Sequence, residues 1–270
     1  MNGRVLIVAG SDSGGGAGIQ ADIKAVTALD GFAMTAITAL TAQDTQGVHG
    51  VVGVDPPFIV QQIEVVLADL GADAIKTGML HSPEVIEAVA ATLRGRAAGV
   101  PLVVDPVMVA KGGHRLLQAA AERTLVDRLL PLANLVTPNL PEAEALVGFA
   151  IASEADMTRA GQAILALGPR AVLVKGGHLD DGRAEVVDLL VTSDGVQRFT
   201  HRRVATRSTH GTGCTLASAI ACGLAQRLAL SEAVARARDY VRRAIETAPG
   251  FGSGHGPLNH AVTLDPGWRR

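Results

Sequence analysis

Aromatic residues, long apolar runs and an excess of one charge are all scarce in this chain. Phe, Trp and Tyr together make up only 3% of the 270 residues, so few rings are available to stack on nucleic-acid bases. The formal net charge is −2 and no dense stripe of Lys or Arg is present, which argues against a nucleic-acid partner. No apolar run approaches the roughly 18–20 residues that span a bilayer, so no membrane partner is expected.

Cysteine is equally scarce, since the chain contains only Cys214 and Cys222. Both fall in one predicted helix, where a separation of about 12 Å is too long for a disulfide bond. We therefore expect two reduced thiols. The apolar run within residues 1–10 is shorter than the hydrophobic region of a signal peptide. These features favour a cytoplasmic protein.

The chain is rich in short apolar runs that alternate with longer amphipathic segments. The apolar runs predict buried strands over residues 5–9, 33–39, 74–77, 102–105, 135–137 and 171–175. The other segments predict helices over residues 18–29, 57–70, 83–94, 119–130, 141–146, 158–167, 213–227 and 231–247. This alternation predicts an α/β fold, with a central, mostly parallel sheet and helices on both faces.

Residues 184–190 and 196–200 depart from this alternation. The residues Ser193-Asp194-Gly195 between them are typical of a hairpin, so we expect an antiparallel strand pair attached to the sheet. We find no linker, internal repeat or low-complexity block. The simplest interpretation is a single domain over residues 1–270.

Polar residues gather where the predicted parallel strands end. They are Asp12, Gln43, Asp44, residues 76–79, Asp105, Asn139 and Lys175. In open α/β sheets the carboxyl ends of the strands form the crevice that binds ligands. We therefore expect these side chains, distant in the sequence, to converge on one edge of the sheet.

Residues 208–215 alternate glycine with small hydroxyl residues just before a predicted helix. Without a Cβ at Gly211 and Gly213, backbone N–H groups can close on a phosphate, and the helix start adds a partial positive charge. Cys214 lies in the first turn of this helix, where a thiolate would be stabilised. An ordinary glycine-rich turn remains the alternative interpretation.

Residues 11–18 form a second glycine-rich segment, between the first strand and the first helix. It is neither a Walker A loop nor a dinucleotide fingerprint, because the required spacings are absent. It could be a flexible turn or a backbone surface that closes over a small ligand, with Asp22 one turn into the helix. Asp22 by itself is more typical of a solvated helix residue.

Asn139 and Glu142 share a face at the start of a predicted helix, where they could hold Mg²⁺ directly or through water. The alternative is that Asn139 caps the helix and Glu142 is an acidic first-turn residue. Asp105 ends a buried strand, and such a carboxylate is costly unless it is paired or bound to a cation. Lys175 precedes two glycines and suits neutralisation of a polyphosphate. We interpret His178 and His210 as polar loop residues.

The sequence resembles the ribokinase-like superfamily. Within it, the sequence most resembles the hydroxymethylpyrimidine/phosphomethylpyrimidine kinase branch. The motifs that carry the resemblance run nearly end to end: residues 9–22, 37–43, 76–80, 105–108, 137–144, 174–178, 210–215 and 254–257. Cys214 stands where most members of the superfamily have an aspartate that acts as the base. A cysteine at this position is usual for this branch.

The resemblance implies a role for each matching position. Asp22, Gln43 and Met79 would contact the pyrimidine, with Val107 nearby. The phosphates of ATP would be bound by Lys175, Thr209, Gly211, Gly213 and Asn139. Mg²⁺ would be organised by Asn139 and Glu142, with Asp105. Cys214, Gly211 and Gly213 would be the catalytic group.

The implied activity is ATP-dependent phosphorylation of 4-amino-5-hydroxymethyl-2-methylpyrimidine, then of its monophosphate, by a homodimer in thiamine biosynthesis. A fused thiamine-phosphate synthase is not expected. A vitamin B6 kinase with the same fold is the main alternative, and a non-catalytic pyrimidine-binding sensor is a remote one.

Overall fold

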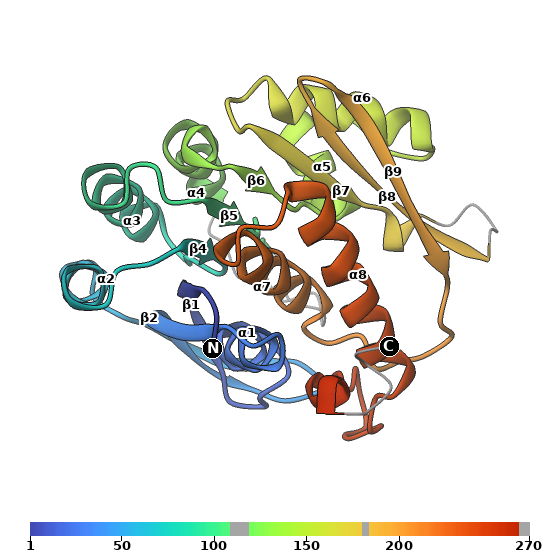
Figure 1. The fold of residues 1–270 in the computed structure, drawn as a ribbon, viewed down its shortest axis with the longest axis horizontal. Coiled ribbons are helices and arrows are strands. Elements are labelled where there is room, and N and C mark those ends of the chain that lie inside the picture. The colour runs from blue at the N-terminus through green and yellow to red at the C-terminus, as the bar shows by residue number, and fades with distance from the viewer. Residues whose placement is uncertain (109–118, 180–183, 265–270) are drawn as a thin grey trace.

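The computed structural model describes residues 1–108, 119–179 and 184–264 (Figure 1). One nine-stranded sheet crosses the molecule in the order β3-β2-β1-β4-β5-β6-β7-β8-β9. The strands are β1 (Arg4–Asp12), β2 (Phe32–Gln43), β3 (Val48–Gly53), β4 (Ala74–Thr77), β5 (Leu102–Val104), β6 (Leu135–Val136), β7 (Ala171–Lys175), β8 (Glu185–Thr192) and β9 (Gly195–Arg202). The strands from β2 to β7 along the sheet pair in parallel, while β3, β8 and β9 pair antiparallel with their neighbours. The predicted fold class is confirmed, including the antiparallel pair β8–β9.

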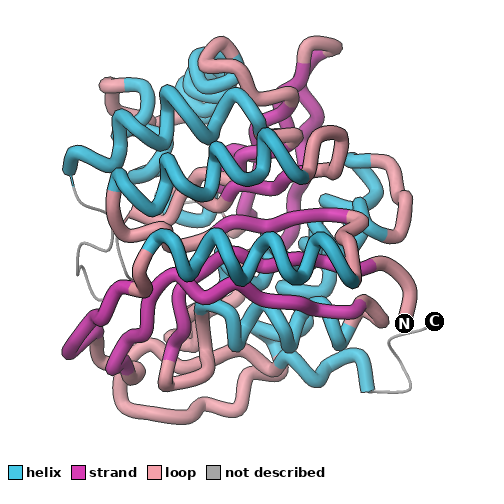
Figure 2. The backbone as a smooth tube through the Cα atoms, turned by 90° about the vertical axis from the view of Figure 1, so that its left-hand side faces the viewer, coloured by secondary structure: helices cyan, strands magenta, loops and turns pink. Residues whose placement is uncertain are grey.

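Helices cover both faces of the sheet. They are α1 (Gly18–Ala28), α2 (Pro56–Asp69), α3 (Pro83–Arg96), α4 (Ala119–Thr124), α5 (Leu140–Val147), α6 (Glu154–Leu165), α7 (Thr212–Ala225) and α8 (Leu230–Glu246). Alternate residues of β1 serve the two faces, since Val5 and Ile7 pack in the cluster of α1, α7 and α8, whereas Leu6 and Val8 pack with α2 and α3. Figure 2 shows the strands running between these helical layers. Burial on both faces explains the continuous apolar strands of the sequence.

The prediction missed β3 (Val48–Gly53), whose residues are all exposed or half-buried and include two glycines. Without a buried face, this edge strand shows no apolar alternation in the sequence. The helix predicted over 119–130 is divided into α4, a π-helical turn at Leu125–Leu129 and a 3₁₀ turn at Leu130–Leu132. α6 begins four residues earlier than predicted, where the Ser153 hydroxyl accepts a hydrogen bond from the Asp156 N–H at 3.1 Å. Within the described ranges, no helix has the length and apolarity that crossing a bilayer requires.

Candidate active site

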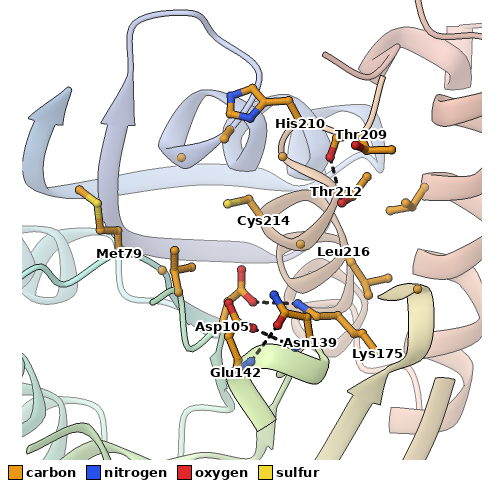
Figure 3. Close-up of a pocket in the computed structure, with 18 of the residues that line it drawn as sticks. Met79, Asp105, Asn139, Glu142, Lys175, Thr209, His210, Thr212, Cys214 and Leu216 are labelled. Atoms are coloured by element: carbon orange, nitrogen blue, oxygen red, sulfur yellow. Dashed lines mark hydrogen bonds and ion pairs between the residues drawn. The ribbon is translucent and has the colours of Figure 1, made fainter. Parts of the chain in front are cut away.

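A cavity of about 960 Å³ opens at the carboxyl ends of the parallel strands, as the positions of the polar residues predicted. Figure 3 shows several of its labelled side chains around the start of α7. The predicted site residues that line it are Gln43, Met79, Val107, Asp105, Asn139, Glu142, Lys175, Thr209, Gly211, Gly213 and Cys214. Asp22 is the one residue with a predicted site role that does not line the cavity. Asp44, which was expected at the same edge of the sheet, does not line it either and instead contacts His49 at 3.0 Å. The prediction that these residues lie together at one edge of the sheet is therefore confirmed for nearly all of them.

The start of α7 points an uncapped helix end into this cavity. Gly211 is the N-cap residue, with φ 77°, and no side chain caps the helix within the described part of the chain. A Cβ at Gly211 would lie only 1.8 Å from the Gly16 carbonyl oxygen, so no larger residue fits there. A Cβ at Gly213 would point toward Lys175, 3.3 Å from its Nζ. The orphan N–H groups of the first turn are therefore open to an anion held next to Lys175.

Lys175 is held by the carboxylate of Asp105, the residue that follows β5, two strands away from β7 in the sheet. Its Nζ lies 3.2 Å from Asp105 Oδ1, which also accepts a hydrogen bond from the Thr137 hydroxyl at 3.2 Å. Burial alone would lower the pKa of Lys175, but the charges of Asp105 and Glu142 raise it above its ordinary value. The lysine thus keeps its positive charge at the cavity wall. Asp105 is satisfied by these partners and needs no metal to be buried.

Asn139 and Glu142 form a capping box at the start of α5. The Glu142 N–H donates to Asn139 Oδ1 at 2.9 Å, and the Asn139 N–H donates to Glu142 Oε2 at 2.8 Å. The capping alternative is therefore the arrangement that the structure contains. Burial nevertheless raises the pKa of Glu142 to about 7. The positive charge of Lys175 opposes this shift, and the negative charge of Asp105 adds to it. A cation that entered beside Glu142 and Asp105 would relieve this cost.

The donor set can be compared with what Mg²⁺ requires. No group of three or more His, Cys, Asp or Glu side chains able to hold a metal occurs among the residues that the structure describes. Mg²⁺ is usually bound through one or two carboxylates, several waters and the substrate phosphates, so a dedicated protein cage is not expected. Glu142 and Asp105, on the same cavity wall, fit that pattern.

Asp22 lies beneath the cavity rather than in it. It is fully buried, and its two carboxylate oxygens accept from Lys76 Nζ at 2.9 and 2.8 Å. The Ser218 hydroxyl donates to the same carboxylate at 2.7 Å. Burial alone would lower the pKa of Lys76, but the attraction of Asp22 raises it. The expectation that Asp22 contacts the pyrimidine is not supported, because Asp22 instead holds Lys76, which does line the cavity.

Cys214 lies in the first turn of α7, as predicted, but its thiol does not ionise readily. Burial raises the pKa of Cys214 to about 12, although the nearby Lys76 ammonium opposes the shift. The expectation of a readily formed thiolate is therefore wrong. The loss of hydration outweighs the partial charge of the helix end. Cys222 is buried in the core below it, and both cysteines are free thiols.

Asp12 and His210, neither of which has a predicted catalytic or binding role, meet at this site. His210 is buried, and its Nε2 lies 2.8 Å from Asp12 Oδ2. Both residues line the cavity. The sequence does indicate a site role for Asp12, because Asp12 ends the first strand immediately before the glycine-rich segment. For His210 the only indication in the sequence is its position next to Gly211.

The far end of the cavity is built by β8, β9 and α8. Asp188 accepts from the Gly176 N–H at 2.9 Å and from Arg238 Nε at 2.7 Å, so it fixes the backbone that follows Lys175. The wall itself is formed by Gly177, Val186, Asp188, His201, Arg203, Val204, Val241, Arg242 and Ile245. None of these residues except those next to Lys175 could be singled out from the sequence.

Comparison with known proteins places this arrangement in a family. The family model described as phosphomethylpyrimidine kinase matches residues 12–259. The hydroxymethylpyrimidine/phosphomethylpyrimidine kinase of Streptomyces coelicolor is 47% identical over 260 residues, which cover 96% of this chain and 95% of that protein. The thiamine biosynthesis bifunctional protein of Geobacter sulfurreducens is 51% identical, and the chain spans about half (53%) of its length.

Solved structures give the same result. The phosphomethylpyrimidine kinase of Clostridium difficile is 43% identical with a TM-score of 0.80, and the match covers 90% of this chain and 99% of that one. An ADP complex of Bacillus subtilis pyridoxal kinase is 33% identical with a TM-score of 0.89, and the match covers 98% and 99% of the two chains. The chain belongs to the phosphomethylpyrimidine kinase family.

Proposed function

We propose that this kinase transfers the γ-phosphoryl group of ATP to 4-amino-5-hydroxymethyl-2-methylpyrimidine and then to the resulting monophosphate, as a step of thiamine biosynthesis. The observation that carries the proposal is one continuous cavity lined by different kinds of groups in different places. Lys175 and the uncapped start of α7 form a site for phosphates, while Gln43 and Met79 offer an amide and an adaptable apolar surface to a small ring.

The reaction follows from this division of the cavity. The hydroxymethyl oxygen attacks the γ-phosphorus, the bond from that phosphorus to the ADP oxygen breaks, and the alcohol proton leaves to solvent or a neighbouring base. Lys175 and the N–H groups at the start of α7 stabilise the charge on the transferring group. Asp105 and Asp188 keep Lys175 and Gly176 in place. In the second transfer the acceptor is already an anionic phosphate oxygen.

The nucleoside part of ATP would occupy the wall formed by β8, β9 and α8. Val186, Val241 and Ile245 supply apolar surface there, and Arg203 supplies a positive charge. Thr209 also lines the cavity, and its carbonyl oxygen accepts from the Thr212 hydroxyl at 3.1 Å. ATP therefore enters with its phosphates directed toward Gly211 and Gly213.

Mg²⁺ would be held by Glu142 and Asp105, with Asn139 positioning Glu142, and it would neutralise the polyphosphate. Glu142→Gln should lower activity at limiting Mg²⁺ and recover part of it at high Mg²⁺. Rates over a Mg²⁺ titration measure this. Melting temperatures should change little, because a glutamine oxygen can still accept from the Asn139 N–H and keep the capping box. A variant with the Mg²⁺ dependence of the unaltered protein would leave Glu142 as a helix cap alone.

The raised pKa of Cys214 leads to a definite expectation for its role. A base is needed for the alcohol but hardly for the monophosphate, so a base would affect the first transfer selectively. Because burial raises the pKa of the thiol to about 12, we expect Cys214→Ala to slow both transfers similarly, by less than the roughly 10²–10⁴-fold typical of a general base. Steady-state rates on the two acceptors measure this, with Cys222→Ala as the control in the same helix. A selective loss on the alcohol would restore the base hypothesis.

Pyridoxine-type substrates remain the second candidate, because pyridoxal kinase structures match the fold with TM-scores near 0.9. The relatives named as hydroxymethylpyrimidine/phosphomethylpyrimidine kinases are closer in sequence, at 44–48% identity against 33% for the pyridoxal kinase of Bacillus subtilis. Rates measured side by side on the pyrimidine and on pyridoxine separate the two. The homodimer stays a prediction.

A further inference from the structure

The glycine loop (residues 13–18) is folded around a carboxylate of its own chain. Asp12 accepts from the Gly14 N–H at 2.8 Å, the Gly16 N–H at 3.1 Å and the Ala17 N–H at 2.7 Å. Burial alone would raise the pKa of Asp12, but these hydrogen bonds and the one from His210 lower it. The loop is therefore held in one shape by an ionised side chain.

His210 joins this loop to the start of α7. Its ring lies against Gly16, where a Cβ would come within 2.5 Å of His210 Cδ2. Its backbone N–H donates to the Gly256 carbonyl oxygen at 3.1 Å. Its Nε2, 2.8 Å from Asp12 Oδ2, must carry a hydrogen, because an ionised carboxylate only accepts.

The same Nε2 also lies 3.2 Å from Nε2 of Gln43. An amide nitrogen can only donate, so two donors face each other in this arrangement. A half-turn of the amide would remove this clash, because Gln43 Oε1 would then face the same N–H and share it with Asp12 as a second acceptor. Gln43 Nε2 would then donate to the Thr41 hydroxyl, which lies 3.3 Å from the amide and itself donates to the Ser11 carbonyl oxygen at 2.9 Å.

We propose that Asp12 and His210 are positioning residues that select the orientation of the Gln43 amide and thereby the ring edge that the cavity accepts. The proposal rests on the proposed function, since it concerns how the acceptor is recognised. With Oε1 turned toward the His210 N–H that Asp12 also accepts, Gln43 presents an N–H to the cavity beside an oxygen that has a lone pair to spare. That pair of groups matches a ring nitrogen that accepts next to an exocyclic amine that donates, as in an aminopyrimidine.

The first test replaces His210 by a ring of similar shape that cannot donate. His210→Phe should raise the KM for the pyrimidine alcohol about tenfold, the usual cost of one misdirected hydrogen bond. The KM for ATP should stay within about twofold, because the ring that packs on Gly16 is kept. His210→Gln, which can still donate to Asp12, should recover part of the loss. Equal rises in both KM values, or no recovery, would overturn the proposal.

The second test asks whether His210 acts through Gln43. The KM for the pyrimidine alcohol in the double variant His210→Phe with Gln43→Leu should match that of Gln43→Leu within about twofold. Additive effects of the two substitutions would overturn the proposal. If His210→Phe does not fold, His210→Asn, whose side chain is too short to reach Asp12, replaces it in the same comparison of single and double variants. Failure of the unaltered protein to phosphorylate the pyrimidine would instead overturn the proposed function.

Discussion

Replacing Lys175 by methionine should lower kcat for phosphorylation of the pyrimidine alcohol by about 10²–10³-fold, the range found when one preorganised group is removed from a developing charge. Lys175 keeps its charge beside Asp105, 3.2 Å away, and faces the first turn of α7. The substitution keeps an unbranched apolar stem one atom shorter than that of lysine but removes the positive charge that the transferring group would meet. Steady-state kinetics at saturating ATP and Mg²⁺ measure the effect, while the KM for the acceptor should change little.

The matched control is Lys24→Met, at a lysine that bonds the Gly15 carbonyl oxygen at 2.8 Å and does not line the cavity. It should leave kcat close to that of the unaltered protein. Lys175→Met also leaves Asp105 without its cation, so Lys175→Met with Asp105→Asn should recover melting temperature without recovering kcat. If Lys175→Met retained the unaltered kcat, Lys175 would be a structural partner of Asp105 only.

Gly211→Ala should also reduce kcat, by about 10²-fold or more, because it moves the N–H groups that face the phosphates. The new Cβ would lie 1.8 Å from the Gly16 carbonyl oxygen, at a φ of 77° that alanine adopts poorly. The helix end must therefore shift away from the glycine loop. Kinetics with ATP and the pyrimidine alcohol, together with a circular dichroism spectrum, would show an inactive but folded protein.

Gly148 provides a close control for Gly211. Its φ is 76°, almost the same, but a Cβ there would meet nothing within 4 Å. Gly148→Ala should cost only the local strain of a left-handed alanine, about 1–2 kcal/mol of stability, and leave kcat unchanged. Equal kinetic losses in the two variants would mean that backbone strain, rather than the packing of α7 on Gly16, explains the Gly211 result.

The sheet could be predicted from the sequence because its central strands are buried on both faces. β4 and β7 were predicted to the residue, and the polar residues at the strand ends, apart from Asp44, do meet in one cavity. β3 was missed because an exposed edge strand carries no apolar pattern. Sequence reasoning thus works where burial constrains composition and fails where it does not.

Depth and long-range pairing account for the errors at the site. Asp22 follows the glycine-rich segment just as a cavity residue would, yet it faces Lys76, 54 residues away, in the core. Asp12, the hydrogen-bond partner of His210, is 198 residues away, so the residues near His210 in the sequence do not indicate this contact. The thiolate of Cys214 was expected from the helix end alone, whereas burial dominates its pKa. Each error concerns how much water or charge reaches a side chain, which the local sequence does not encode.

The most direct test of the account is the identity of the product. The protein is incubated with ATP, Mg²⁺ and 4-amino-5-hydroxymethyl-2-methylpyrimidine, and the products are followed by mass spectrometry over time. The account predicts that a monophosphate appears first and is then converted to the diphosphate, with pyridoxine phosphorylated more slowly in a parallel reaction. Pyridoxine phosphate as the only phosphorylated product would contradict it.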